Sequence, residues 1–402
     1  MTTESIAIVG GGIGGLTAAL ALLRRGIDVT VYEQAAELKE IGAGVQTTPN
    51  GTRVLIELGL QDGMDRFGTQ TSGKQIHLWS TGQTWQFQTL GQEAAQRYGV
   101  PYLTFHRADL HSLLLEAVLE LKPDAVKLDR KFAGFSASDD QVSIRFEDGS
   151  SASASLLVGA DGVHSRVREQ LFGEAPTRFT GVYAWRGLIP ATQLDDHFNL
   201  TGGGMWLGTV AHIITYPVRK GTMLNFVGLV DSDGWQKESW SELGSPTECL
   251  ADFKGWHADV QQMIRSMSVL YKWALVVREP MPAWSRGRIT LLGDACHATL
   301  PFLSQGANMA MEDGLVLARC IAAGRGRLQH AIKRYEQARI ERTSRIVRSS
   351  GEQVRRVHAP QLASPDTAGR YIEEQWAANA VEDRYDWIWS YDARTAELPA
   401  ID

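Results

Sequence analysis

Glycine residues close to the N-terminus have the spacing of a loop that binds a dinucleotide. Gly10, Gly12 and Gly15 follow an apolar run at residues 6–9 and precede strong helix formers at residues 16–25. In such a loop the first glycine allows a tight turn, the second lets the backbone approach a pyrophosphate, and the third lets the helix pack closely on the strand. The phosphates then lie at the helix N-terminus, where free N–H groups and the helix dipole favour anions.

A carboxylate lies where a dinucleotide would place its ribose. Residues 29–32 predict a second buried strand, and Glu33 follows it directly. An acidic residue about 20 positions beyond the glycine motif hydrogen-bonds the ribose hydroxyls in such folds. Strand, turn, helix and strand together form a βαβ unit. A glycine turn with a purely structural role is the alternative, and this context favours a bound dinucleotide.

Two further motifs combine glycine and aspartate. Asp161-Gly162 follows an apolar segment at residues 156–158, and Gly293-Asp294 follows another at residues 287–292. Each motif precedes an expected helix. An aspartate after a strand can simply cap the next helix, so that alternative stays open for each motif taken alone.

The hydrophobic patterns predict an α/β protein: a Rossmann-like nucleotide-binding domain, an inserted mainly antiparallel β domain and a C-terminal helical segment. Helices are expected at residues 16–25, 49–58, 107–121, 306–323 and 328–357. Hairpins are expected at residues 76–88 and around Asp148-Gly149, where alternating residues surround turn signals. Runs between residues 178 and 275 read as antiparallel strands separated by glycine and proline.

Composition excludes several functional classes. The 402 residues carry 46 acidic and 40 basic side chains, a net charge of −6, which argues against a nucleic-acid partner. The basic residues at 333–356 alternate with acidic ones, which predicts a solvated helix face. Cys249, Cys296 and Cys320 have no metal-site spacing, so no metal is expected. With no apolar stretch of membrane-spanning length and no signal peptide in the sequence, we expect a cytoplasmic protein with no membrane partner.

The three motifs, in this order and spacing, resemble those of the FAD-dependent aromatic hydroxylases, the single-component flavoprotein monooxygenases. The resemblance covers nearly the whole chain. It implies that the glycine motif binds the ADP half of FAD, that Asp161 and Gly162 contact both FAD and the reduced nicotinamide nucleotide, and that Asp294 holds the ribityl chain. The cofactor-binding residues that it implies are Gly10, Gly12, Gly14, Gly15, Glu33, Gly44, Val45, Arg107, Asp161, Gly162, Gly293, Asp294, Pro301 and Gly306.

The same resemblance divides the chain. Residues 1–75, 106–177 and 276–325 are expected to form the FAD-binding domain, residues 76–105 and 178–275 the substrate domain, and residues 326–402 the C-terminal helical region. One departure lies after Pro301, where many members have Gly-x-Gly and this chain has Ser304-Gln-Gly306.

His212 and Tyr216 lie in a segment that looks most like the salicylate hydroxylases and is similar to 3-hydroxybenzoate 6-hydroxylases and 6-hydroxynicotinate 3-monooxygenases. Four residues apart on a strand, they share one side of a sheet. Taken alone they are ordinary sheet residues; the resemblance favours a pocket, with His212 as general base, relayed through Tyr216. Arg186 and Arg219 are the candidates to bind a substrate carboxylate.

The implied reaction uses FAD, NADH or NADPH, and O₂ to hydroxylate a small phenolic carboxylate. Salicylate 1-hydroxylation with decarboxylation to catechol is the preferred expectation. Ring hydroxylation of 3-hydroxybenzoate or 6-hydroxynicotinate is the alternative within the family, and an FAD oxidase or dehydrogenase without oxygen insertion is the alternative from another class. The resemblance also allows a homodimer.

Overall fold

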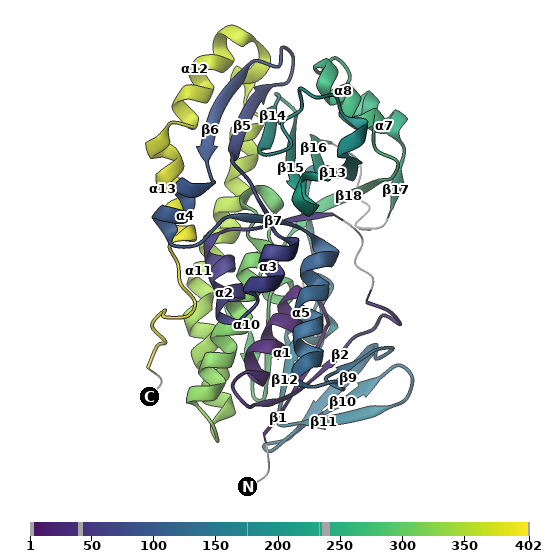
Figure 1. Cartoon of the computed structure of the whole chain (residues 1–402). Helices are drawn as coiled ribbons and strands as arrows, with labels where there is room; N and C mark the ends of the chain where they lie inside the picture. The colour runs from purple at the N-terminus through teal and green to yellow at the C-terminus, as the bar shows by residue number, and fades with distance from the viewer. Residues whose placement is uncertain (1–3, 39–42, 175, 233, 235–241, 401–402) are drawn as a thin grey trace.

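The computed structural model describes residues 4–38, 43–174, 176–232, 234 and 242–400. Two sheets dominate it, with the nucleotide-binding domain at one end of the molecule and a second sheet at the other (Figure 1). The long helix α11 (Leu328–Val357) runs along the side of the molecule (Figure 1). The expected α/β class, with a Rossmann-like domain, antiparallel sheets and C-terminal helices, is confirmed.

The first sheet has the strand order β19-β20-β12-β1-β2-β8. All neighbours pair in parallel except β19 with β20. Its inner strands are buried on both faces, which explains why they are continuous apolar runs in the sequence. The bounds are β1 (Ser5–Val9), β2 (Asp28–Tyr32), β8 (Val126–Lys127), β12 (Leu156–Gly159), β19 (Ser285–Arg286) and β20 (Ile289–Leu291).

Helix α1 (Ile13–Leu23) connects β1 to β2 and packs against α5 (Arg107–Leu121) and α10 (Gly306–Ala323). The sequence placed α1 at residues 16–25. The helix instead begins inside the glycine motif, because Gly12 is its N-cap, and it ends earlier, because residues 24–26 form a turn in which Gly26 has φ of +67°. The predicted bounds of α5, α10 and α11 are confirmed.

Two small antiparallel sheets accompany this domain, with orders β3-β7-β4 and β11-β10-β9. The hairpin expected around Asp148-Gly149 is the β10–β11 pair. The strands are β3 (Gly44–Thr47), β4 (Thr69–Gln70), β7 (Leu103–His106), β9 (Phe132–Ala137), β10 (Val142–Phe146) and β11 (Ser151–Ala154). Nearby helices are α2 (Pro49–Glu57), α3 (Gln61–Phe67), α4 (Gln92–Tyr98), α6 (Arg166–Phe172) and α9 (Asp294–His297).

The second sheet has eight strands in the order β17-β18-β13-β16-β15-β14-β5-β6. Neighbours are antiparallel except β14 and β5, and the hairpin expected at residues 76–88 is the β5–β6 pair. The bounds are β5 (Gly73–Leu78), β6 (Thr84–Thr89), β13 (Arg178–Pro190), β14 (Gly203–Leu207), β15 (Ala211–Val218), β16 (Met223–Asp231), β17 (Leu243–Gly244) and β18 (Leu270–Val277).

The two faces of this sheet have different partners. Trp185, Ile213 and Phe226 point to one face, where they form a core with Phe253 and Ile264 from the region of α7 (Pro246–Asp252) and α8 (Ala258–Arg265). Because side chains alternate along a strand, the neighbours of these residues point to the opposite face. That opposite face lines the cavity described below.

The C-terminal helices α11, α12 (Pro365–Gln375) and α13 (Ala378–Trp389) lie along one side of both sheets (Figure 1). The prediction of a solvated face on α11 was wrong at several positions, among them Arg339 and Arg342. Arg339 is completely buried and pairs with Glu312 and Asp313 of α10, and Arg342 pairs with Glu312. Acidic residues on a neighbouring helix, distant in sequence, account for this burial.

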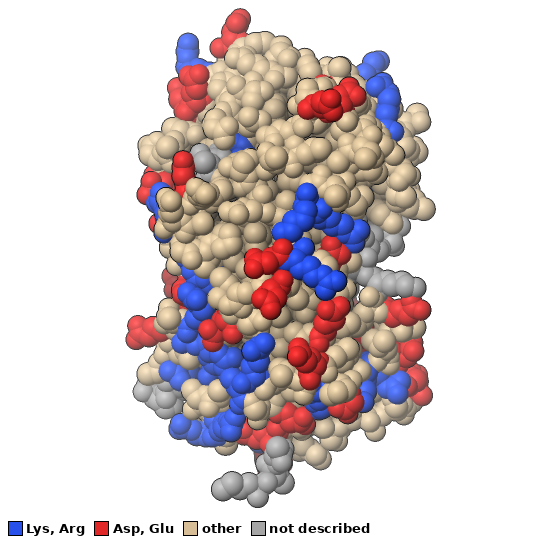
Figure 2. All heavy atoms as spheres, viewed as in Figure 1, with Lys and Arg blue, Asp and Glu red and all other residues tan. Residues whose placement is uncertain are grey.

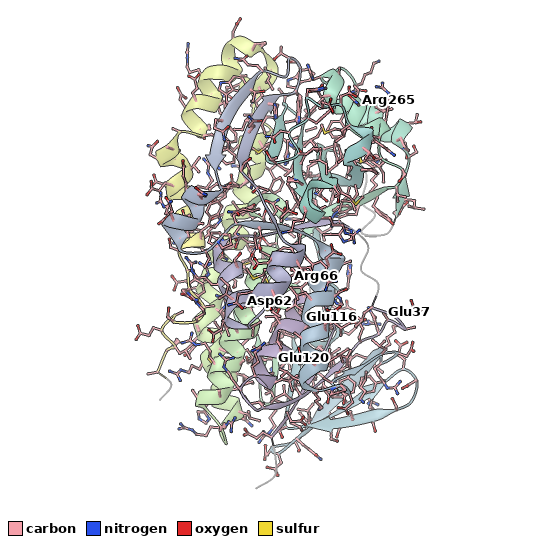
Figure 3. The ribbon with its side chains drawn as sticks, in the orientation of Figure 1. Glu37, Asp62, Arg66, Glu116, Glu120 and Arg265 are labelled. Atoms are coloured by element: carbon pink, nitrogen blue, oxygen red, sulfur yellow. The ribbon has the colours of Figure 1, made fainter. Side chains whose placement is uncertain are left out.

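Charge on the visible surface is mixed in sign. Basic and acidic side chains intermingle over the nucleotide-binding end, whereas the opposite end of this face is largely uncharged (Figure 2). The labelled residues Asp62 and Arg66 of α3 and Glu116 and Glu120 of α5 lie on this outer face (Figure 3). Within the described residues, no helix is long and apolar enough to cross a membrane.

Candidate active site

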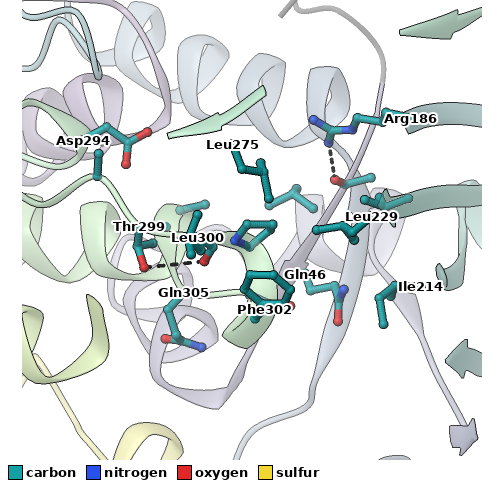
Figure 4. A pocket seen from close by; sticks show the side chains of 18 of the residues that line it. Gln46, Arg186, Ile214, Leu229, Leu275, Asp294, Thr299, Leu300, Phe302 and Gln305 are labelled. Atoms are coloured by element: carbon teal, nitrogen blue, oxygen red, sulfur yellow. Dashed lines mark hydrogen bonds between the residues drawn. The ribbon is translucent and has the colours of Figure 1, made fainter. Parts of the chain in front are cut away.

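A continuous cavity runs between the two sheets. It consists of two adjoining parts of about 670 and 380 Å³, which share Arg107 and Asp294 among their lining residues. Glu33 lines the first part, beside the glycine turn, and His212 lines the second, beneath the eight-stranded sheet. Asp294 lies toward one side of the second part and Ile214 and Leu229 toward the other (Figure 4). The cavity therefore joins the expected nucleotide site to the expected substrate site.

The glycine turn has the shape that a bound pyrophosphate requires. Gly10 has φ of +110°, and a Cβ there would lie 2.3 Å from the carbonyl oxygen of Ala160. A Cβ at Gly15 would lie 2.0 Å from the carbonyl oxygen of Gly10, so only glycine allows this helix-to-strand contact. At Gly12, by contrast, a Cβ would meet nothing within 4 Å, and no side chain caps α1. The free helix N-terminus and the open space at Gly12 fit the phosphates of FAD.

The carboxylate of Glu33 is held beside this turn. One oxygen accepts a hydrogen bond from the backbone N–H of Gly11 at 2.7 Å, and the other accepts from Ala35 N–H at 2.9 Å. Each carboxylate oxygen has a second lone pair, which can accept from a hydroxyl group. Glu33 is thus fixed in orientation and still able to bind ribose hydroxyls.

Asp161 and Asp294 have different surroundings. Asp161 accepts from the Ser165 hydroxyl at 2.5 Å and from the backbone N–H groups of Arg166 and Val167 at 2.8 and 3.1 Å. Its carboxylate therefore accepts from free N–H groups at the N-terminus of α6. This is the helix-capping role that the sequence left open as an alternative. Gly162 next to it has φ of +78° and an open side that faces the cavity.

Asp294 begins α9 with its carboxylate in the cavity (Figure 4). Among the described residues, none makes a hydrogen bond to this carboxylate. Burial raises the pKa of Asp294, and the positive charges of His297 and Arg107 oppose that rise. A carboxylate to which no described residue donates a hydrogen bond is suited to accept from the hydroxyls of a ribityl chain.

The loop that carries Asp294 is anchored from behind. Asp313 accepts from the backbone N–H of Gly293 at 3.1 Å and bonds His297 Nε2 at 2.5 Å. The ligand atoms of Cys296, His297 and Asp313 lie within 4.8 Å of one another, a spacing that could suit a metal ion. Because the oxygens of Asp313 already accept from Gly293, His297 and Arg339, we assign this cluster to support of the loop.

Other residues that the resemblance implied also line this cavity. Gly44 and Val45 of β3 lie on it, as do Pro301, which begins a 3₁₀ turn, and Gly306, the first residue of α10. Ser304, at the position where many relatives have glycine, adopts φ of +56°. The backbone at Ser304 is therefore left-handed, a conformation that favours glycine and is adopted here by serine.

His212 lines the second part of the cavity. Its ring is buried, lies 5.5 Å from the ring of Phe302 and has its Nδ1 atom 2.7 Å from Nε2 of His358. Burial, together with the charge of a protonated His358, holds the pKa of His212 well below its ordinary value. His212 is therefore neutral at pH 7 and able to accept a proton.

Tyr216 shares the sheet face with His212 but lies about 13 Å along the strand, four residues at 3.3 Å each. Burial raises its pKa to about 12, opposed by Arg186 and by a hydrogen bond with Gln46. Tyr216 is thus a protonated hydrogen-bond donor. The hydrogen bond of His212 runs to His358, so the geometry does not support the relay through Tyr216 that the sequence suggested.

Lys74 is a site residue that sequence reasoning missed. Its ammonium group donates to Gln46 Oε1 at 3.1 Å, lies 5.0 Å from the centre of the Tyr102 ring and faces the cavity. Burial lowers its pKa to about 8. Among the described residues no carboxylate pairs with it. The available signal was a lysine that shares one face of an alternating strand with the apolar residues Ile76 and Leu78.

The two arginines proposed for a substrate carboxylate have separate positions. Arg219 is about half exposed, binds Asp109 through two nitrogens at 2.8 and 2.9 Å and does not line the cavity. It was therefore a wrong candidate. Arg186 lines the cavity and donates to the carbonyl oxygen of Gly44 at 2.7 Å (Figure 4).

Gly44 allows β3 to touch the substrate sheet. A Cβ there would lie 2.4 Å from the Tyr216 ring and 2.7 Å from Cγ of Asn225. We expect Gly44→Ala to lower the free energy of unfolding by about 1–3 kcal/mol and to weaken substrate binding, because the ring must move into the cavity. Urea denaturation of the FAD-loaded protein and KM measure the two effects. Gly351→Ala is the control: a Cβ there meets nothing, so wild-type or slightly higher stability is expected.

The fold and the cavity fit a dinucleotide-binding enzyme whose cavity extends beneath a second sheet. Residues 3–350 match the FAD binding domain family. The chain belongs to this family and is a flavoprotein aromatic monooxygenase, as its relatives show. It is 38% identical to the 3-amino-4-hydroxybenzoate 2-monooxygenase of Streptomyces platensis over 96% of both chains. It is 36% identical to the 3-hydroxybenzoate 6-hydroxylase of Polaromonas naphthalenivorans, again over 96% of both chains.

Solved structures agree with this assignment. Klebsiella pneumoniae HpxO, complexed with FAD and uric acid, superposes with a TM-score of 0.83 at 27% identity, over 96% of both chains. A salicylate hydroxylase in a substrate complex superposes with a TM-score of 0.81 at 25% identity, over all of both chains. FAD is therefore the cofactor that the family and these solved structures support.

Proposed function

We propose that this enzyme uses NADH or NADPH and O₂ to hydroxylate the ring of a small hydroxyaromatic carboxylate. The observation that carries the proposal is the pair of groups in one chamber, a neutral imidazole at His212 and an ammonium at Lys74. A base and a cation are the two groups that a phenolic acid requires. The relatives named above act on aromatic acids that carry a hydroxyl group.

FAD, when bound, supplies electron transfer and the activation of oxygen. The N-terminus of α1 would hold its pyrophosphate, Glu33 its ribose and Asp294 its ribityl chain. Arg107 lines both parts of the cavity and would lie against the cofactor between them. The residues that would hold FAD thus line the part of the cavity that adjoins the substrate chamber.

His212 would accept the proton of the substrate hydroxyl. A phenolate ring is richer in electrons than a phenol ring, so it reacts faster with an electrophilic oxygen atom. Tyr216, protonated at neutral pH, would donate a hydrogen bond to the substrate. Apolar side chains, among them Ile214, Leu275 and Phe302, line the chamber and exclude water, which protects the reactive oxygen species from wasteful decay (Figure 4).

Lys74 would bind the substrate carboxylate. We expect Lys74→Met to raise KM by about 10-fold to 100-fold with little change in kcat. This increase corresponds to the loss of one hydrogen bond between charged groups. In the wild type KM should rise above about pH 8, because Lys74 is charged below its pKa of about 8 and loses that charge above it. Steady-state kinetics from pH 6 to 9.5 measure both effects.

The control for this prediction is Lys254→Met, at an exposed position outside the cavity, which should leave the profile unchanged. If Lys74→Met keeps the wild-type KM and its rise above pH 8, Lys74 does not bind the carboxylate. Arg186 would then be the cation to test.

Ring attack can keep or expel the carboxyl group. The names of two relatives favour retention, since they place the new hydroxyl group on a ring carbon that does not bear the carboxyl group. The 6-hydroxynicotinate 3-monooxygenase, 38% identical to this chain, is named for attack at the carbon that bears the carboxyl group, which favours expulsion. Salicylate conversion to catechol, preferred from the sequence, is the second candidate, and the full-length superposition on a salicylate hydroxylase favours it.

The experiment is oxidation of NADH and of NADPH by the FAD-loaded enzyme with four acids, each product being identified by chromatography. The acids are 3-hydroxybenzoate, 6-hydroxynicotinate, 3-amino-4-hydroxybenzoate and salicylate. A hydroxylated product that keeps its carboxyl group supports the first candidate. A product that has lost it, catechol from salicylate or a dihydroxypyridine from 6-hydroxynicotinate, supports expulsion of the carboxyl group. Hydrogen peroxide without any hydroxylated product from all four acids would contradict the proposal and favour an oxidase.

A further inference from the structure

Three side chains connect the substrate chamber to the protein surface. His212 Nδ1 lies 2.7 Å from His358 Nε2, and His358 Nδ1 lies 2.7 Å from Asp231 Oδ1. His212 and the side chain of His358 are buried, whereas the side chain of Asp231 is 41% exposed. The three residues come from β15, the end of α11 and the end of β16. They form one unbroken line of hydrogen bonds.

The carboxylate fixes the direction of this line. An ionised Asp231 can only accept, so His358 Nδ1 must carry a proton and donate it. In neutral His358 the Nε2 atom is then an acceptor, so His212 Nδ1 must carry a proton in turn. This leaves His212 Nε2 as the unprotonated nitrogen, the atom that a general base requires. Asp231 at the surface thus sets the tautomer of the buried His212 through two successive hydrogen bonds.

A proton taken up by His212 has a reason to move on. Burial disfavours the charged form of the His212 ring, because a buried charge loses its hydration. His358 directly follows the last residue of α11, and the C-terminal end of a helix stabilises a nearby positive charge. Asp231 adds a negative charge on the other side. Among the described residues, no other ionisable side chain forms a hydrogen bond or ion pair with His212, His358 or Asp231.

We propose that His212, His358 and Asp231 form a proton relay that carries the substrate's hydroxyl proton to solvent. The proton leaves the substrate oxygen for His212 Nε2, the proton on His212 Nδ1 passes to His358 Nε2, and the proton on His358 Nδ1 passes to Asp231 and then to water. Each imidazole ring gains a proton on its Nε2 atom as it loses one from its Nδ1 atom, so the rings stay neutral and the proton reaches the surface. His358 and Asp231 are positioning and relay residues; the inference rests on the proposed function, which supplies the hydroxyl group.

The test follows the proton directly. Oxidised, FAD-loaded enzyme is mixed with whichever of the four acids the wild type hydroxylates. An indicator dye in weak buffer reports the release of the proton, and ultraviolet absorbance reports the formation of the phenolate. In His358→Gln, glutamine can still accept from His212 but cannot pass a proton on. In Asp231→Asn the charge is lost. We expect both variants to ionise the substrate and release its proton at least about tenfold more slowly at pH 7.

The pH profile separates a relay from a structural role. The defect should shrink as pH approaches about 10, the pKa of an ordinary phenol, because the substrate then arrives ionised. A fall of equal size at every pH, or a wild-type rate in both variants, would overturn the relay. If His358→Gln does not fold, Asp231→Asn at the surface decides the question. Asp196→Asn, at an exposed position of the same domain, is the matched control.

The outcomes also distinguish this inference from the proposed function. A wild-type enzyme that hydroxylates none of the four acids contradicts the proposed function. A wild-type enzyme that ionises and hydroxylates one of them, with unchanged proton release in both variants, contradicts the relay alone.

Discussion

His212→Gln should lower kcat for ring hydroxylation by about 10²-fold to 10⁴-fold at pH 7, the usual contribution of a general base. Glutamine keeps a polar group in the chamber but cannot accept a proton at neutral pH. The loss should diminish as pH rises toward about 10, where the substrate hydroxyl ionises without help. Rates of product formation from pH 6 to 9.5 measure this dependence.

The matched control for this substitution is His330→Gln, at an exposed position of α11 outside the cavity, which should keep wild-type rates. Binding of FAD, measured by its fluorescence, should be unchanged in both variants. Equal turnover of His212→Gln and the wild type at every pH would show that the substrate loses its proton by another route. In that case Tyr216 could not replace the histidine as base, since its pKa of about 12 keeps it protonated.

The nucleotide-binding half of the molecule could be predicted because its determinants are local in sequence. Close contacts within the βαβ unit, or with the residue that follows β12, require glycine at positions 10 and 15, and α5, α10 and α11 were bounded correctly from their periodicity. The start of α1 was missed because glycine is a poor helix former and does not normally predict a helix start. Here Gly12 is the N-cap, and no side chain caps the helix, which leaves its N-terminal N–H groups free for an anion.

The substrate chamber could be predicted only in part, because its contacts join distant segments. The resemblance pointed to His212 and Tyr216, but His358 lies 146 residues beyond His212 and follows a helix that gave no sign of approaching β15. Lys74 was missed because a lysine on a short strand is usually solvated. Arg339 was misassigned for the same reason, since the sequence cannot show which helix will cover it.

Arg339→Ala should lower the free energy of unfolding by about 3–5 kcal/mol, because it removes a positively charged partner from two buried carboxylates. Arg339 donates to Asp313 at 2.7 Å and pairs with Glu312 at 2.6 Å, and all three side chains are completely buried. Burial alone would raise the pKa of each carboxyl; Arg342 and Arg339 hold that of Glu312 below its usual value, and His297 and Arg339 do so for Asp313. Urea denaturation at saturating FAD measures the difference.

The sign of the pH dependence provides a second check. A carboxyl whose pKa is lowered in the folded state stabilises the protein above its unfolded pKa of about 4, and this stabilisation is lost as pH falls through the folded pKa. The gap between wild type and Arg339→Ala should therefore be largest near pH 7 and narrow below about pH 4. Arg348→Ala, at an exposed position of the same helix, should change stability by no more than about 0.5 kcal/mol.

The same substitution should also weaken FAD binding, which links the buried network to catalysis. Asp313 holds Gly293 and His297 on either side of the loop that presents Asp294 to the cavity. Without Arg339, Asp313 loses the partner that orients it from α11, so the loop loses its anchor. An Arg339→Ala enzyme with wild-type stability and wild-type FAD affinity would show that His297 and Arg342 satisfy both carboxylates by themselves.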